Sequence, residues 1–183
     1  MQVLILPLTV AVLGASAWAV REDLLTHRIP NRLTGPLLAV VVALQCAVGG
    51  WRGIEAGILG ALVGFAMLLP FYLLRAMGAG DVKLFAGLGA ALGPYWAFVA
   101  GVDTIIAGGV LAIGYLFCGA IGAALEPAGA PWALRLQCAH ERAQQLRRAR
   151  FPYALAIAVG AIAALAQRGD LQLIYDFLRG VRP

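Results

Sequence analysis

The chain has 183 residues, of which 62% are hydrophobic and 13% are charged, and its formal net charge is +5. Soluble domains are about half apolar and about a quarter charged, so this composition excludes a soluble globular protein and indicates an integral membrane protein. Because a membrane-crossing helix needs about 20 apolar residues, the length allows about five to seven crossings and no sizeable soluble domain. We expect residues 1–183 to form a single membrane-embedded domain. The positive charge suits loops near anionic lipid headgroups and does not call for nucleic acid as a partner.

Long apolar runs follow one another along the chain. They continue far beyond the roughly ten residues of a barrel strand and do not alternate in polarity, so they predict α-helices. Glycines recur at short spacing inside the third and fourth runs, and such small residues let helix backbones approach closely. These glycines include Gly57, Gly60, Gly64, Gly87, Gly89 and Gly93. The expected fold is an all-α polytopic membrane bundle of about six helices. The expected crossings are Gln2–Val20, Leu33–Val48, Ile54–Leu74, Leu84–Val102, Thr104–Leu125 and Phe151–Ala166.

The basic residues predict the orientation of this bundle. If the N-terminus lies outside, ten of the 14 Lys and Arg residues fall in loops on the inner side. These are Arg21, Arg28, Arg32, Arg75, Lys83, Arg135, Arg142, Arg147, Arg148 and Arg150. Such an excess fits the tendency of cytoplasmic loops to be basic. Asp23 and Asp81 would then both lie at the cytoplasmic face.

The supply of reactive side chains excludes several chemistries. Ser16 is the only serine, and neither histidine, His27 or His140, lies in a motif that would serve it. The chain has no His-Glu-x-x-His zinc motif, no C-x-x-C pair among its three cysteines and no phosphate-binding glycine loop ending in Lys-Ser or Lys-Thr. We therefore expect neither a metal nor a cofactor. The acids remain as the candidates for catalysis.

Two acids stand at the ends of apolar runs. Asp81 lies in the turn Gly78-Ala79-Gly80-Asp81-Val82-Lys83, and Asp23 follows the first run. Two carboxyl groups can hydrolyse an amide when one is ionised and takes a proton from water while the other is protonated and polarises the carbonyl. The low dielectric of a bilayer edge separates their titrations, and such a pair titrates as a unit.

Each acid also has a structural interpretation. Asp81 is well placed to cap a helix that begins near Val82. Asp23 is equally well placed as an interfacial acid paired with Arg21 or Arg28. Asp103 precedes another expected helix on the outer side, where capping accounts for it. Taken singly, neither Asp23 nor Asp81 is identified as catalytic by its position.

Three segments together resemble one protein family. Gly78-Ala79-Gly80-Asp81-Val82-Lys83 matches the G-x-G-D-x-K motif of type IV prepilin peptidases, bacterial members of the GxGD group of membrane aspartyl proteases. Asp23, followed by Arg28-Ile29-Pro30-Asn31-Arg32-Leu33-Thr34, is similar to the first-aspartate segment of that family. Pro152-Tyr153-Ala154 looks like its late Pro-Tyr-Ala element. The resemblance spans most of the chain in the right order.

The resemblance implies roles for individual residues. Asp23 and Asp81 would be the catalytic pair. Gly78 and Gly80 would let the loop bring Asp81 toward Asp23. Lys83 would orient this loop or tune the pair, although a membrane-surface anchor is an equally good interpretation. Of the remaining matched residues, Pro30 and Asn31 would shape the turn into the second helix.

The short first loop distinguishes this chain within the family that it resembles. Longer members carry a cytoplasmic region with paired Cys-x-x-Cys motifs and also methylate the new N-terminus, whereas this chain has only Arg21–Arg32 between its first two expected helices. Methyl transfer is therefore not expected. The short form is similar to the peptidases of tight-adherence (Flp) pilus systems. It implies a bacterial inner-membrane enzyme of pilus biogenesis and protein secretion that removes basic leaders from prepilins at the cytoplasmic side.

Two further alternatives stay open at this point. A non-enzymatic bundle, such as a small transporter or a pilus-assembly subunit, would use Asp23 and Asp81 as a proton relay or in ion pairs. A peptidase instead requires the two carboxyl groups to lie near each other. The polar segment from Glu126 to Arg150 is either a surface linker with basic anchors or a substrate-docking arm.

Overall fold

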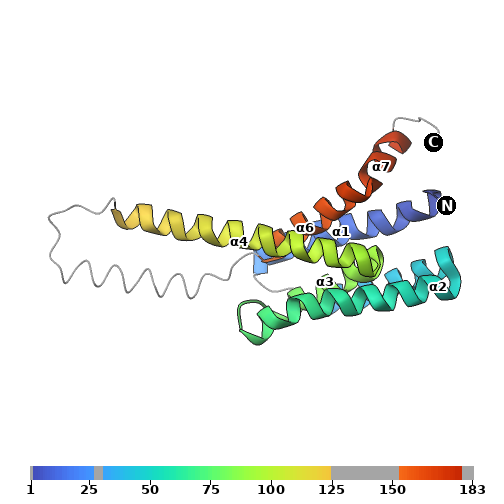
Figure 1. Ribbon diagram of the computed structural model, residues 1–183, viewed down its shortest axis with the longest axis horizontal. Coiled ribbons are helices and arrows are strands. Elements are labelled where there is room, and N and C mark those ends of the chain that lie inside the picture. Colours follow the sequence, from blue (N-terminus) through green and yellow to red (C-terminus); the bar gives the residue numbers. More distant parts are fainter. Residues whose placement is uncertain (1, 27–30, 125–152, 179–183) are drawn as a thin grey trace.

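The computed structural model describes residues 2–26, 31–124 and 153–178, and every regular element in these ranges is a helix (Figure 1). The helices are α1 (Gln2–Thr26), α2 (Asn31–Leu73), α3 (Ala79–Leu92), α4 (Pro94–Ala124), α6 (Tyr153–Arg168) and α7 (Asp170–Leu178). The expected all-α class is confirmed for this part of the chain. Pro30 and the basic segment from Glu126 to Arg150 lie outside the described residues.

Helix α2 is two helices joined at a sharp bend. Gly50 has φ 56° and ψ −135°, a conformation that favours glycine because it has no Cβ. In a straight helix Gln45 and Gly57 would be about 18 Å apart, yet a Cβ on Gly57 would lie 3.5 Å from Cγ of Gln45. The chain therefore folds back at Gly50. The two halves of α2 correspond to the second and third expected crossings.

The boundary expected between the fourth and fifth crossings is wrong. The structure breaks the chain at Gly93, which has φ 80°, and begins α4 at Pro94. Glycine at the end of one helix and proline at the start of the next are the preferred residues at these positions. Asp103 consequently lies inside α4 and does not cap a helix. Its carboxylate accepts a hydrogen bond from Nε2 of Gln167 at 3.0 Å.

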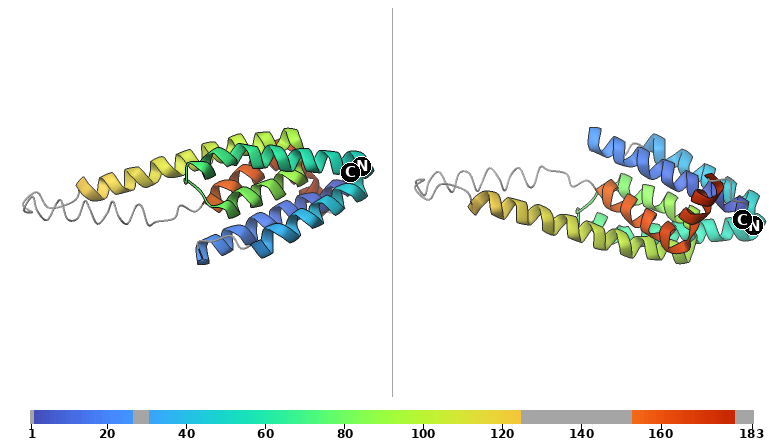
Figure 2. Two further views of the ribbon diagram at one scale, coloured as in Figure 1. Left: turned by 90° about the horizontal axis from the view of Figure 1, so that it is seen from below. Right: turned by 90° about the horizontal axis from the view of Figure 1, so that it is seen from above.

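The helices run alternately up and down one bundle (Figures 1 and 2). The end of α1, the turn before α3 and the start of α6 lie at one end of the bundle, and α7 lies at the other, near the N-terminus. Two described segments, Gly49–Leu73 and Pro94–Gly114, are long and apolar enough to cross a membrane, and only 22% of the most apolar stretch of each is buried. Such exposure of apolar residues suits contact with lipid. The number of six crossings and the outside N-terminus stay predictions.

Close packing between α2 and α3 places α3 inside the bundle. Gly57, Gly60 and Gly64 form one face of α2, and a Cβ on Gly60 would collide with the carbonyl oxygen of Gly89. The expected close approach at these glycines is confirmed. Along α3 the side chains are buried on nearly every side, and Leu84, Phe85 and Leu88 are fully inaccessible to solvent. Helix α3 is therefore the central helix of the fold.

We expect Gly60→Ala to destabilise the protein because the added methyl group must push α3 away from α2. The cost of such overpacking is about 1–3 kcal/mol. Unfolding of the purified protein in mixed detergent micelles measures it. Gly14→Ala is the matched control, since nothing lies within 4 Å of a Cβ there and alanine is the better helix former. Equal stability of the Gly60→Ala and parent proteins would contradict the close packing.

Candidate active site

Asp23 lies on the buried face of α1. Val12, Ser16, Ala19 and Asp23 are separated by four, three and four positions and are all buried, so they line one side of the helix. The Asp23 side chain is 8% exposed. Its neighbour Arg21 is exposed and lies 3.6 Å from Oε1 of Glu22, measured from Nη1. Asp23 is thus buried because it continues the buried side of α1, and it lies at the end of the bundle where α3 begins.

Asp81 is in the first turn of α3, but it is not the N-cap expected from the sequence. The helix begins at Ala79, Gly78 is the N-cap, and Asp81 is the third residue of the helix. The Gly78 N–H donates a hydrogen bond of 3.0 Å to Oδ2 of Asp81, and the Asp81 N–H donates one of 3.2 Å to the Gly78 carbonyl oxygen. The carboxyl group therefore reaches back over the start of its own helix. The Asp81 side chain is 9% exposed.

The two acids interact with each other. Burial raises the pKa of Asp81 from 3.8 to about 6, the hydrogen bond from Gly78 opposes this shift, and the negative charge of Asp23 adds to it. Burial has the largest effect because it removes water from the ionised carboxylate. The structure thus places Asp23 and Asp81 within electrostatic range of each other.

Tyr153 is a third residue at this end of the bundle. It begins α6, is half-buried, and lies within electrostatic range of the Asp81 carboxylate. The sequence singled out Tyr153 only through the Pro-Tyr-Ala element and assigned it no role. Its nearness to Asp81 could not be read from spacing, because 72 positions of chain separate the two residues.

The supporting residues lie in different surroundings. Gly78 is the N-cap of α3 and Gly80 lies in the first turn of that helix, so both glycines are close to Asp81 in the chain. Lys83 is exposed, whereas Asp81, two residues earlier and about 200° around the helix, is buried. Asn31 begins α2, its side chain lies outside the described residues, and so does Pro30. Among the described side chains, no three His, Cys, Asp or Glu residues are grouped as metal ligands.

Comparison with known families identifies the class of the protein. A model of the type IV leader peptidase family matches residues 7–113, which is more than half of the chain and includes both Asp23 and Asp81. Together with the apolar helices, this match defines a membrane peptidase. The chain belongs to the type IV leader peptidase family. The resemblance seen in the motifs is therefore confirmed at the level of the family. Pro152-Tyr153-Ala154 lies beyond the matched residues.

Searches of curated proteins and of solved structures find no match to this chain.

We predict that Asp23→Asn lowers the pKa of Asp81. The Asp23 charge contributes to raising that pKa above 3.8, so removing the charge favours ionisation of Asp81. Difference infrared spectroscopy of the carboxyl band follows this titration, with Asp81→Asn to assign the band. Glu22→Gln is the control, since Glu22 neighbours Asp23 in sequence and its carboxylate lies beside the guanidinium of Arg21. An unchanged midpoint in Asp23→Asn would show that the two acids do not interact.

Proposed function

We propose that this chain is an aspartic endopeptidase that removes the short basic leader from prepilins, with Asp23 and Asp81 activating water. The observation that carries the proposal is the meeting of these two buried acids from α1 and α3 at one end of the bundle. Family membership supports a leader-peptidase activity. The aspartic mechanism and the pilin substrate are our inference from the site.

The proposed reaction needs one proton between the two carboxyl groups. The ionised carboxylate takes a proton from water while the protonated one donates a hydrogen bond to the scissile carbonyl. The water oxygen bonds to the carbonyl carbon and forms a tetrahedral intermediate. The C–N bond then breaks as the amine takes up a proton, and the carboxyl pair returns to its starting state. Burial supports this scheme because it disfavours ionisation of both groups at once.

The place of the acids in the bundle supports a substrate that is itself anchored in the membrane. Leu24 and Leu25 beside Asp23 are 59% and 66% exposed, and Leu73 and Leu74 before the turn to α3 are 70% and 77% exposed. Exposed leucines therefore flank a buried pair of acids, which suits cleavage at the edge of the bilayer. We propose that this edge is the cytoplasmic face of a bacterial inner membrane. The substrates would be Flp-type pilins or pilin-like proteins, and methyl transfer would not accompany cleavage.

Replacing either acid should abolish cleavage of a co-expressed Flp-type prepilin. Asp23→Asn and Asp81→Asn keep the shape of the side chain and remove the shared proton, so leader removal should fall below detection on a gel of the pilin. Asp103→Asn is the matched control, because Asp103 lies on α4 and bonds to Gln167, away from the pair. Full cleavage by either Asp23→Asn or Asp81→Asn would rule out the two-acid mechanism.

The rate of cleavage should also depend on pH, and the titration of Asp81 should determine whether it rises or falls. Its pKa is raised to about 6, so the proton that the reaction uses is held below that pH and lost above it. The value of kcat should therefore fall as the pH rises through about 6. Initial rates on a purified prepilin in detergent, from pH 4.5 to 8.5, measure the profile. A kcat that climbs continuously across that range would mean that no proton of the pair is needed.

A further inference from the structure

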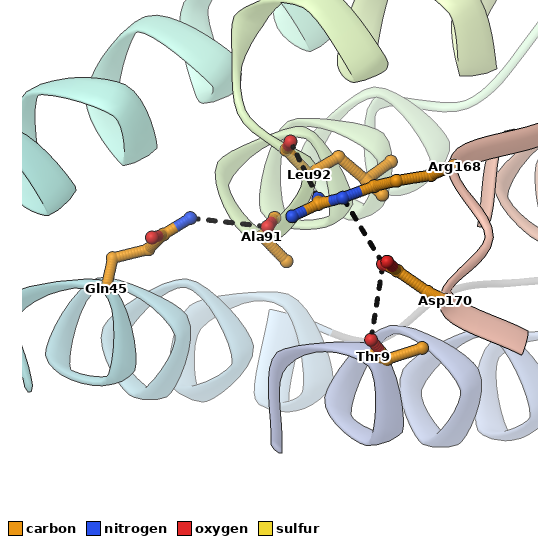
Figure 3. A network of polar contacts seen from close by, with 6 residues as sticks. All are labelled: Thr9, Gln45, Ala91, Leu92, Arg168 and Asp170. Atoms are coloured by element: carbon orange, nitrogen blue, oxygen red, sulfur yellow. Dashed lines mark hydrogen bonds and ion pairs between the residues drawn. The ribbon is translucent and has the colours of Figure 1, made fainter. Parts of the chain in front are cut away.

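Helix α3 ends inside the bundle, and side chains from two other helices hold its last carbonyl groups. Nε2 of Gln45, on the first half of α2, lies 2.9 Å from the Ala90 oxygen and 3.2 Å from the Ala91 oxygen. Nη1 of Arg168 donates to the Leu92 oxygen at 3.4 Å (Figure 3). The last carbonyls of a helix have no partner within it, and leaving them buried without one is costly. These contacts satisfy the end of α3.

Arg168 connects this end of α3 to α1. Its Nε lies 3.4 Å from Oδ2 of Asp170, and the same oxygen accepts a hydrogen bond of 3.4 Å from Oγ1 of Thr9 (Figure 3). Asp170 is 4% exposed and Thr9 is 2% exposed, so water competes little for these contacts. A continuous chain of polar contacts thus runs from Leu92 through Arg168 and Asp170 to Thr9. We call these four residues the α1–α3 bridge.

The helices joined by this bridge are the two that carry the acids. Along α1, Thr9 and Asp23 are 14 residues apart, or about 21 Å, and along α3, Leu92 and Asp81 are 11 residues apart, or about 16 Å. An α-helix is stiff along its axis, since each of its turns is hydrogen-bonded to the next. Fixing α1 against α3 at the bridge therefore fixes the axial position of Asp23 relative to Asp81 at the other end.

We propose that Arg168 and Asp170 are positioning residues for the acid pair, and that the α1–α3 bridge sets the separation of Asp23 and Asp81. This inference rests on the proposed function for its effect on catalysis. The effect is exerted through two helices, and neither Arg168 nor Asp170 touches the substrate. Displacing a reacting group by about 1 Å costs about a hundredfold in rate, so a small slip of α3 along α1 is enough.

The chain offers a matched control for the bridge. Gln167 is the neighbour of Arg168 at the end of α6 and donates a hydrogen bond to Asp103 on α4. This contact ties α6 to α4 and includes neither α1 nor α3. Gln167→Ala therefore removes a polar contact at the same end of the bundle without touching the bridge.

The test compares Asp170→Asn, Arg168→Gln and Gln167→Ala in the full chain, purified in detergent. We expect the first two to lower kcat for the prepilin by roughly tenfold to a hundredfold with little change in KM, and Gln167→Ala to change neither. Arg168→Lys keeps the charge opposite Asp170 and should recover part of the loss. Infrared titration of Asp81 gives a second readout, and its midpoint should shift in Asp170→Asn and Arg168→Gln alone.

The outcomes separate this inference from the proposed function. If the parent chain leaves the prepilin intact, the proposed function fails, but the titration of Asp81 still decides whether the bridge positions the acids. Parent-like kcat and an unshifted Asp81 midpoint in folded Asp170→Asn would overturn the inference. An equal loss in Gln167→Ala would do the same, because it would show a general effect on stability. Should Arg168→Gln fail to fold, Asp170→Asn, which keeps the shape of the side chain, gives the answer.

Discussion

The close contact between α2 and α3 is the constraint on which the rest of the structure depends. Because Gly60 has no side chain, the backbone of α2 can lie against the backbone of α3 at Gly89, and α3 becomes the central helix. Most of the side chains of α3 are then removed from solvent, including the carboxyl group of Asp81 near its start. The raised pKa of that group is a direct consequence, since burial is its largest cause. Helix packing thus determines the acid chemistry.

A central helix surrounded by apolar residues must have both of its ends satisfied from within the protein. At the start of α3, the Gly78 N–H donates to the carboxylate of Asp81, which favours the ionised form, whereas burial disfavours it. Burial prevails, and the shift to about 6 leaves the carboxyl group able to exchange its proton near physiological pH. At the other end, the amide of Gln45 and the guanidinium of Arg168 serve the last carbonyls. The two ends of α3 therefore have different tasks, one to hold a titratable group and one to fix the helix in place.

The sequence placed Asp23 and Asp81 at one end of the bundle correctly, but it misplaced some helix boundaries. Asp23 and Asp81 could be placed at the same end because an even number of expected crossings separates them. That Asp23 lies on the inner face of α1 came only from the structure, because the whole helix is apolar and its sequence marks no single buried side. The break at Gly93 was missed because the apolar run continues through it, so only the Gly-Pro pair marked the turn. The position of Asp81 as the third residue of α3 was also missed. The true N-cap, Gly78, has no polar side chain that would mark it as a capping residue in the sequence. The α1–α3 bridge could not be foreseen, because its hydrogen bond from Thr9 to Asp170 joins residues that are 161 positions apart in the chain.

The buried acids at the two ends of the bundle have neighbours of opposite charge, which bears on catalysis. Burial raises the pKa of Asp170, and the ion pair with Arg168 and the hydrogen bond from Thr9 oppose part of that rise. At the acid pair, the charge that acts on the pKa of Asp81 is that of another carboxylate, Asp23, and it adds to the effect of burial. Burial thus raises the pKa of both acids, but a positive neighbour opposes the rise at Asp170 and a negative neighbour adds to it at Asp81. A purely structural role would favour the first arrangement at both ends, because an ion pair offsets the cost of burial and two like charges increase it. The second arrangement has a use when a proton has to be shared and moved, which is the requirement of hydrolysis by two carboxyl groups.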